Sequence, residues 1–199
     1  VATGYGRVSV PYADKMITEI TCHAMGAVWI FDNKDMTIID IGGQDTKIIC
    51  VEQGFVKDFM MNDKCSAGTG RFLEIMANTL SMRPNEMCEL AREGSGVTIS
   101  SMCTVFAESE VISLIGQGEK KENIAFAVVD SIVRKVAAQA NRMSEDRPML
   151  CLTGGLCECS YISEALTKEL GMEVKTDPQS RYAGAIGAAL GAVKKGKKN

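Results

Sequence analysis

Two cysteines stand in similar settings in the sequence. Cys65 lies in "MNDKCSAGTGRF", where a turn of small residues opens into a helical pattern, and Cys103 lies in "SSMCTVFAESE" after a polar, turn-prone approach. We expect each thiol at a helix N-terminus, where unpaired N–H groups and the positive end of the helix dipole favour the thiolate. Thiolates in such a setting suit a zinc ion or an iron–sulfur cluster.

The residues alone leave three interpretations of this pair open. A [4Fe–4S] cluster usually takes four thiolates, and two equal contributions from a symmetric dimer would complete the set. A four-cysteine zinc site across such a dimer is a rival. The third interpretation is that Cys65 and Cys103 are buried and hold no metal, since free cysteine packs as a small hydrophobe.

The other six cysteines are weaker candidates for chemistry. Four of them lie in apolar stretches and are predicted to belong to the core: Cys22, Cys50, Cys88 and Cys151. Cys157 and Cys159 form a C-x-C pair, which is tighter than the usual spacing of zinc ligands, so we interpret it as incidental or redox-sensitive.

A second group of candidates follows an apolar run with strand composition. Asp40 ends that run and is followed closely by Gly42, Gly43, Gln44 and Asp45. A carboxylate at this place can hold Mg²⁺ directly or through water, and glycines let backbone N–H groups approach phosphate oxygens. Taken alone, a simple hairpin turn explains the glycines equally well.

Two later motifs add to this pattern. In "LTGG" a buried-strand pattern runs into Gly154 and Gly155, where a flat ring or a phosphate could lie against the backbone, although a plain strand-to-helix turn is the simpler explanation. "AGAIGAAL" (Ala183–Leu190) predicts a helix of small residues that packs its backbone close to a neighbour.

The predicted elements alternate in type along the chain. Strand composition marks residues 37–41, 46–52, 55–61, 148–153 and the stretch "MEVKT", and helical periodicity marks residues 13–25, 69–80, 84–92, 104–116, 123–143, 160–170 and 181–195. We expect Gly26 to end the first of these helices. Strands followed by alternating helices and strands indicate an α/β or mixed-sheet fold.

Composition narrows the class of protein. The chain has 199 residues, 46% hydrophobic and 24% charged, with a net charge of −3, which argues mildly against a nucleic-acid partner. The sequence shows neither a signal peptide nor an apolar run of membrane-spanning length, so we expect a cytoplasmic protein without a membrane partner.

Together and in this order, "IDIGGQD", "LTGG" and "AGAIGAAL" resemble the second phosphate motif, the adenosine motif and the second connecting helix of the actin/Hsp70/sugar-kinase (ribonuclease H-like) ATPases. That resemblance implies an α/β fold of two lobes with nucleotide between them. Residues 1–35 would be a remnant of the first lobe, 36–178 the second lobe, and 179–199 the returning helix and basic tail. The sequence starts abruptly at Val1 and lacks the first phosphate motif of these ATPases, so we expect an N-terminal part of the first lobe to be missing.

Within that superfamily, "IDIGGQDTK", "MNDKCSAGTGRFLE", "SSMCTVFAESEVISL", "LTGG", "ATGYGR" and "CHAMGA" resemble the activator ATPases of 2-hydroxyacyl-CoA dehydratases, a group that includes the ATPase subunits of benzoyl-CoA reductase. The resemblance covers nearly the whole chain. It implies a homodimer that shares one [4Fe–4S] cluster through Cys65 and Cys103. Reduced by ferredoxin or flavodoxin, such a protein passes an electron to its dehydratase when ATP binds.

The same resemblance assigns roles around the nucleotide. Asp40 and Asp45 would contact Mg²⁺ and phosphate, with Gln44 beside them. The phosphates of ATP or ADP would lie along Gly42 and Gly43, and the adenosine side along Gly154 and Gly155. Without the first phosphate motif, ATP turnover by the printed chain alone is not implied.

Two other functions remain open at this stage. A small-molecule kinase of the same fold would need no paired cysteines, and a non-redox regulatory protein of this fold would carry zinc or no metal. We interpret His23, the only histidine, as a hydrogen-bonded structural residue and Glu108 as a solvated or helix-pairing carboxylate.

Overall fold

The computed structural model describes residues 1–101, 103–143 and 148–193. Short 3₁₀ helices are labelled η. The elements, in chain order, are η1 (Tyr5–Ser9), α1 (Glu19–Phe31), β1 (Met36–Ile41), β2 (Thr46–Glu52), β3 (Phe55–Asn62), α2 (Gly70–Thr79), α3 (Pro84–Ala91), α4 (Thr104–Gly116), α5 (Lys121–Met143), β4 (Leu150–Thr153), η2 (Gly155–Glu158), α6 (Ser160–Leu170), β5 (Val174–Lys175), η3 (Ser180–Tyr182) and α7 (Ala183–Val193).

One mixed sheet organises these elements. Its strand order is β3-β2-β1-β4-β5, in which β1, β2 and β3 form an antiparallel meander while β4 pairs parallel to both β1 and β5. Gln53 and Gly54 both have positive φ, 52° and 81°, as a tight two-residue turn between β2 and β3 requires. The predicted α/β mixed-sheet class is therefore confirmed.

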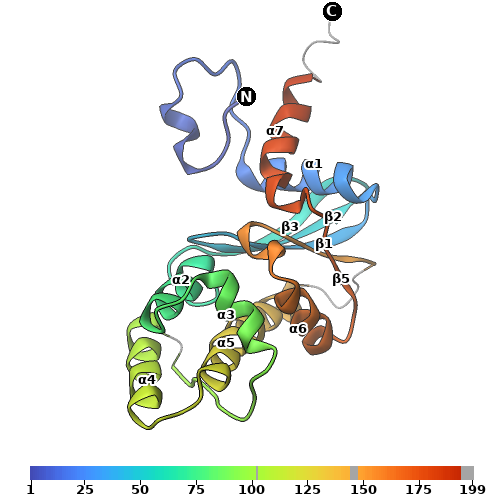
Figure 1. Ribbon diagram of the computed structural model, residues 1–199. Coiled ribbons are helices and arrows are strands. Elements are labelled where there is room, and N and C mark those ends of the chain that lie inside the picture. The colour runs from blue at the N-terminus through green and yellow to red at the C-terminus, as the bar shows by residue number, and fades with distance from the viewer. Residues whose placement is uncertain (102, 144–147, 194–199) are drawn as a thin grey trace, which may run out of the picture.

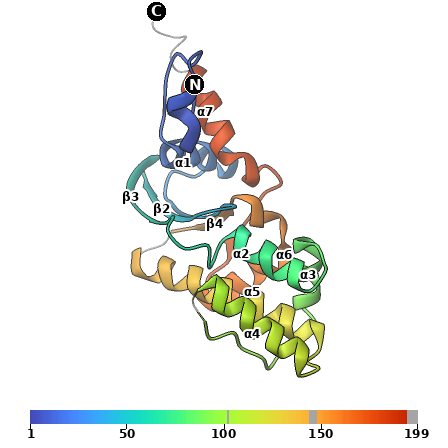
Figure 2. The same cartoon turned by 90° about the vertical axis from the view of Figure 1, so that its left-hand side faces the viewer.

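Helices cover both faces of this sheet. Figures 1 and 2 show α1 and α7 on one face and α2, α3, α5 and α6 on the other, with α4 packed beside α2 and α5. Side chains of β1 alternate accordingly: Met36 and Ile38 pack with α1, whereas Ile39 and Ile41 belong to the larger core beneath the other helices. Burial on both faces explains why β1 reads as a continuous apolar run.

The first helix differs from its prediction. We expected residues 13–25 with an end at Gly26, but α1 begins after Thr18, whose hydroxyl accepts a hydrogen bond from Thr21 N at 3.3 Å, and it runs through Gly26 to Phe31. Gly26 is a packing residue rather than a helix terminator. A Cβ on it would lie 1.9 Å from the Ala183 carbonyl oxygen of α7.

A second close approach joins the same two helices about one turn away. A Cβ on Gly187 would lie 1.8 Å from the Cys22 carbonyl oxygen, so the backbones of α1 and α7 touch on both sides. This explains the small-residue composition of α7 and confirms its predicted close packing. Among the described residues, no helix is both long and apolar enough to cross a membrane.

Candidate functional site

The register of the sheet gathers three polar side chains below α1. Asp40 lies opposite Lys47 of β2 on one side and opposite Thr153 of β4 on the other. All three point to the α1 face, because Asp40 is in phase with Ile38 of the α1-facing set. Thr153 donates a 3.0 Å hydrogen bond to Asp40 Oδ1, and Lys47 Nζ lies 3.4 Å from Asp40 Oδ2.

Lys47 is the centre of a buried ion cluster. Its side chain is only 2% exposed, and Nζ also lies 3.1 Å from Glu19 Oε1 and 2.7 Å from Asp45 Oδ1. Burial works to lower the pKa of Lys47, but the charge of Asp40 and the hydrogen bond to Asp45 outweigh it, so that pKa is raised. The charged ammonium thus ties α1, β1 and the turn before β2 together.

His23 completes the cluster from α1. Nε2 lies 3.2 Å from Asp40 Oδ1, and Nδ1 lies 3.2 Å from the Glu19 carbonyl oxygen. Both neighbours accept hydrogen bonds, so an imidazolium that donates from both nitrogens satisfies them best. Burial works to lower the pKa of His23, but the hydrogen bond and charge of Asp40 raise it overall. The interpretation of His23 as a hydrogen-bonded residue is confirmed.

Asp40 itself is a fully engaged carboxylate. Burial works to raise its pKa, but the hydrogen bond and charge of His23, with the charge of Lys47, lower it below the ordinary value. Glu19, His23 and Asp40 each present one metal-ligating atom within 4.8 Å of the others. The ammonium of Lys47 already pairs with two of these three side chains, Glu19 and Asp40.

The turn between β1 and β2 leaves its tip open. Gly42 N donates to the Asp45 carbonyl oxygen at 2.9 Å and closes the turn, while Gly43 and Gln44 at its tip are exposed. Asp45 is buried beneath the tip, where Oδ2 accepts a 3.2 Å hydrogen bond from the Tyr5 hydroxyl. Two exposed residues with unhindered backbone therefore stand directly above a buried ion cluster.

The second glycine motif meets the first. Gly154 has φ of +81°, and a Cβ on it would lie 2.4 Å from the Ile41 carbonyl oxygen and 2.7 Å from Asp40 Oδ1. Only glycine fits both the conformation and the space. Gly155 next to it is exposed. "LTGG" and "IDIGGQD", far apart in sequence, thus form one glycine-lined corner at the ends of β1 and β4.

The β1–β2 turn also contacts the start of α2. Gly70 N donates to the Gly42 carbonyl oxygen at 2.9 Å, and Arg71 N donates to the Gly43 carbonyl oxygen at 2.8 Å. These bonds satisfy two of the N–H groups that a helix leaves unpaired at its N-terminus. Any shift of the turn is therefore transmitted to the first turn of α2.

Cys65 and Cys103 differ in how they meet their helices. Cys103 is the residue that caps α4 and is exposed, as predicted for a helix N-terminus. For Cys65 that prediction is wrong: α2 is capped by Thr69, and half-buried Cys65 lies earlier, in the loop. Gly68 interrupts the path with φ of +86°, a left-handed conformation that cannot continue a helix.

Direct contacts still join the two cysteine segments. Ser66 Oγ and Thr104 Oγ1, each on the residue after a cysteine, lie 2.6 Å apart. Lys135 of α5 reaches the first cysteine, with Nζ 3.7 Å from Cys65 Sγ. The structure thus brings the two predicted metal-ligating segments together beside a cation.

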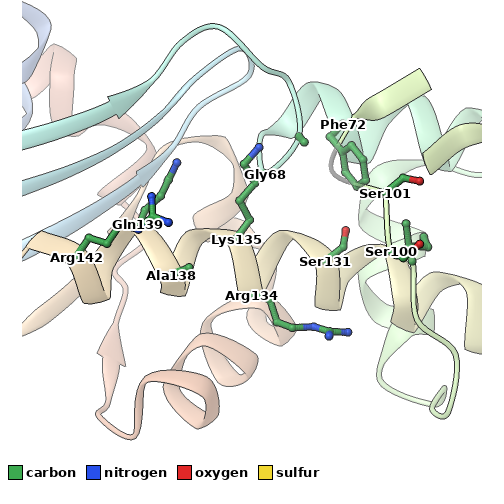
Figure 3. Close-up of a pocket in the computed structure, with 12 residues that line it drawn as sticks. Gly68, Phe72, Ser100, Ser101, Ser131, Arg134, Lys135, Ala138, Gln139 and Arg142 are labelled. Carbon is green, nitrogen blue, oxygen red and sulfur yellow. The ribbon is translucent and has the colours of Figure 1, made fainter. Parts of the chain in front are cut away.

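A pocket of about 440 Å³ opens beside this cation. Figure 3 shows Lys135 reaching from α5 to the Gly68 turn, while Arg134 points away from that turn. A Cβ on Gly68 would lie 3.1 Å from Lys135 Cδ, so the glycine makes room for the lysine stem. Ser100 and Ser101, in the loop before α4, border the other side of the pocket. Glu110 holds this loop by accepting a 2.9 Å hydrogen bond from Ser100 N.

The remaining predicted residues have structural surroundings. Glu108 accepts a 3.4 Å hydrogen bond from Thr79 of α2, which is the predicted helix-pairing role. Cys22, Cys88 and Cys151 are buried core residues as predicted, whereas Cys50 on β2 is half-buried. Cys157 and Cys159 are buried as well.

Comparison with known proteins finds a matching family and similar relatives. Residues 1–192 match the model of the BadF/BadG/BcrA/BcrD ATPase family. The chain is 48% identical over 200 residues to the (R)-2-hydroxyglutaryl-CoA dehydratase activating ATPase of Acidaminococcus fermentans, an alignment that covers 100% of this chain and 76% of that protein.

Solved structures agree with the fold. The crystal structure of component A of the Acidaminococcus fermentans dehydratase superposes with a TM-score of 0.94 at 48% identity, covering 99% of this chain and 76% of that one. The Clostridium difficile activator of 2-hydroxyisocaproyl-CoA dehydratase, solved with bound ADPNP, gives a TM-score of 0.90 at 39% identity, covering 99% and 76%. The expected actin/Hsp70/sugar-kinase-like fold is thereby confirmed.

Sequence reasoning missed several members of the site. Lys47, Glu19 and Tyr5 were not singled out, although "DTK" places Lys47 two residues after Asp45. The signal that identifies Lys47 is its strand register opposite Asp40, which requires the pairing of β1 with β2. Lys135 and the Ser66–Thr104 contact follow only from the packing of helices.

Proposed function

The chain belongs to the BadF/BadG/BcrA/BcrD ATPase family, and we propose that it is an ATP-driven one-electron donor. Its partner would be a 2-hydroxyacyl-CoA dehydratase or a related acyl-CoA reductase. The activators of this kind among its relatives support the role. The contact between the residues after Cys65 and Cys103 carries the proposal, because it joins the two segments that hold the candidate thiolate ligands.

We infer that the glycine-lined corner holds ATP or ADP. The exposed backbone of Gly43 and Gln44 would receive the phosphates, and Gly154 with Gly155 would lie along the adenosine side. Asp45 and Gln44 are proposed to act on phosphate-bound Mg²⁺. Asp40, already held by three neighbours, would act on that ion only through water. The ADPNP-bound relative supports nucleotide binding at this fold.

The cysteine segments fit half of an iron–sulfur site. Cys103 is exposed at a helix cap, Cys65 is half-buried with a lysine ammonium near its sulfur, and the two loops are hydrogen-bonded to each other. Two thiolates are half of the usual set, so a second copy would supply the rest. A [4Fe–4S] cluster bound there would take one electron from ferredoxin or flavodoxin and give it to the dehydratase.

Exposed apolar residues support a dimer at this place. Val105 and Phe106 lie two and three residues after Cys103 and are 66% and 64% exposed, and Ile112 on the same helix is 56% exposed. Large apolar side chains that cluster at a surface mark interaction sites. We propose that α4 meets its two-fold mate and closes the four-thiolate set.

A short chain of contacts would couple the nucleotide to the cysteines. The carbonyl oxygens of Gly42 and Gly43 in the β1–β2 turn accept hydrogen bonds from the first turn of α2. Ser66, in the loop before α2, contacts Thr104. A turn that shifts between ATP and ADP would therefore move both cysteine segments. Residues 36–178 hold this whole relay, in keeping with a proposed division into residues 1–35, 36–178 and 179–199.

The test is anaerobic purification followed by an absorbance spectrum and iron and sulfide analysis. We expect a brown protein with about four iron atoms per dimer, the content of one bridging [4Fe–4S] centre. Cys65→Ser and Cys103→Ser should each lose the colour. Cys50→Ser, a half-buried cysteine on β2, is the matched control and should keep it. A colourless wild-type protein that binds zinc or no metal after reconstitution would refute the electron-donor role.

A further inference from the structure

Two other thiols meet where α3 contacts α6, outside the site around the β1–β2 turn. Cys88 lies on α3, and Cys159 is the residue that caps α6. Their side chains are hydrogen-bonded to each other. The residues are 1% and 6% exposed, respectively. Both are free cysteines in the structure.

A clamp beside this pair fixes the two helices. Arg92, one helical turn after Cys88, donates a 3.0 Å hydrogen bond to the hydroxyl of Ser160, the residue after Cys159. The same guanidinium pairs with Glu164 and lies 5.3 Å from the centre of the Tyr161 ring. The contact between the thiols is thus held by packing and by side-chain bonds one turn away.

The surroundings make the two sulfur atoms unequal. The hydrogen bond from Cys88 lowers the pKa of Cys159, against the effect of burial, and the N–H groups of Ile162 and Tyr161 at the start of α6 add to the lowering. The same hydrogen bond, together with burial, raises the pKa of Cys88. Cys159 is therefore the better nucleophile and Cys88 the proton-bearing partner.

We propose that Cys88 and Cys159 are a redox-modification site that forms a reversible disulfide on exposure to a small peroxide. The Cys159 thiolate attacks one oxygen of hydrogen peroxide, breaks the O–O bond and becomes a sulfenic acid, and the departing hydroxide takes up a proton to leave as water. The Cys88 thiol then attacks that sulfur, forms the S–S bond and releases a second water. The two sulfur atoms supply the two electrons that reduce the peroxide.

The neighbourhood favours this chemistry over metal binding. In the described part of the chain, only Glu19, His23 and Asp40 form a group of three metal-ligating side chains. That group lies on the opposite face of the sheet. The thiol pair therefore lacks a third ligand of these types. Because both residues are buried, a small peroxide can reach their sulfur atoms more readily than a bulky disulfide reagent can.

Cys157 is a built-in comparison two residues away. Burial raises the pKa of Cys157 to about 11, so its thiol stays protonated at neutral pH. Cys157 is as buried as Cys159, at 6%. If burial and sequence position alone governed reactivity, both cysteines of the C-x-C pair would react alike.

The disulfide would join α3 to the segment that follows the adenosine-side glycines. Gly155 begins η2, and η2 leads directly to Cys159. Cross-linking therefore fixes one end of this connection to α3 and removes conformational freedom from the unfolded chain.

Peptide mapping of the full chain tests the proposal. Anaerobically purified protein is treated with a small excess of hydrogen peroxide, unfolded in the presence of an alkylating agent, digested without reductant and analysed by mass spectrometry. We expect a linked peptide pair containing Cys88 and Cys159, which dithiothreitol separates. Cys157→Ala should still give the linked pair, whereas Cys159→Ala should leave Cys88 alkylated.

Wild-type protein alone can overturn the idea, so the result does not depend on the folding of a variant. Alkylation of both Cys88 and Cys159 after peroxide, or a link from Cys159 to Cys157, would refute it. Peroxide that takes Cys159 to the sulfinic acid without a link would refute it as well. These outcomes are read at Cys88, Cys157 and Cys159, and the electron-donor role is read at Cys65 and Cys103, so failure of one proposal is distinguishable from failure of the other.

Discussion

Ser66 and Thr104 share a hydrogen bond of 2.6 Å, although they lie 38 positions apart in the sequence. Each immediately follows a proposed cluster ligand. The bond therefore fixes the loop before α2 to the first turn of α4. For the proposed cluster, it would provide a preformed half-site before any metal arrives.

Loss of this bond should weaken metal retention. Thr104→Val keeps the shape of the side chain but removes the hydroxyl, and a neutral hydrogen bond contributes about 0.5–1.5 kcal/mol. We expect iron to be released to a chelator roughly two- to tenfold faster than from the wild type. Thr104→Ser, which keeps the hydroxyl, should restore the wild-type rate. Equal release from all three proteins would show that the bond plays no part in holding the half-site.

Lys135 should set the reduction potential of the proposed cluster. Its ammonium lies 3.7 Å from Cys65 Sγ, and a positive charge so close stabilises the form that carries the extra electron. Lys135→Met should shift the midpoint potential to more negative values by tens of millivolts, measured by a redox titration followed by electron paramagnetic resonance.

Arg134 offers the control for that measurement. It lies next to Lys135 on α5, but it pairs with Asp130 and points away from the Gly68 turn (Figure 3). Arg134→Met should leave the potential nearly unchanged. Equal shifts in the two variants would indicate a general surface-charge effect instead of a specific contact.

Lys47 should be essential for stability. Lys47→Met keeps the buried stem but leaves Glu19, Asp40 and Asp45 without their shared cation, and removal of one partner of a buried ion pair costs about 3–5 kcal/mol. The free energy of unfolding in urea measures the loss. Lys57→Met, which breaks an exposed pair with Glu52, should cost at most about 1 kcal/mol.

His23 should make the stability depend on pH. Its pKa is raised in the folded state, so its contribution is fully present below the ordinary value near 6.5 and is lost as pH rises through the folded value. We expect the free energy of unfolding to fall over that window in the wild type. His23→Gln should remove this slope, and because His23 is the only histidine, no other imidazole can supply it. An unchanged slope in the variant would show that the pKa of His23 is the same in the folded and the unfolded chain.

Much of the fold could be predicted from local pattern. β2 and α6 have the bounds that composition and periodicity indicate, because strand composition fills β2 and helical periodicity fills α6 from end to end. α1 could not be bounded in this way. Gly26 looks like a helix end in the sequence, yet its role is set by α7, which arrives at the far end of the chain.

The candidate site likewise contains residues that local sequence patterns reveal and residues that only the fold reveals. Asp40, Gly42 and Gly154 are visible as motifs because tight turns demand particular residue types. The partners of Asp40 are not visible, since Lys47 and Thr153 reach it through strand register and His23 reaches it from a helix. The sequence also assigned Cys65 to the N-terminus of α2, although Thr69 caps that helix and the left-handed Gly68 separates it from Cys65.

The backbone contact of α1 with α7 bears on how the chain reaches its native state during synthesis. The β1–β2–β3 meander needs only neighbouring residues and can pair early, but Gly26 of α1 stays uncovered until α7 has left the ribosome. Contacts of such high sequence separation slow folding, and incomplete chains expose apolar surface meanwhile. Premature truncation before α7 should therefore yield a product that depends on chaperones, even though every strand of the sheet is already present.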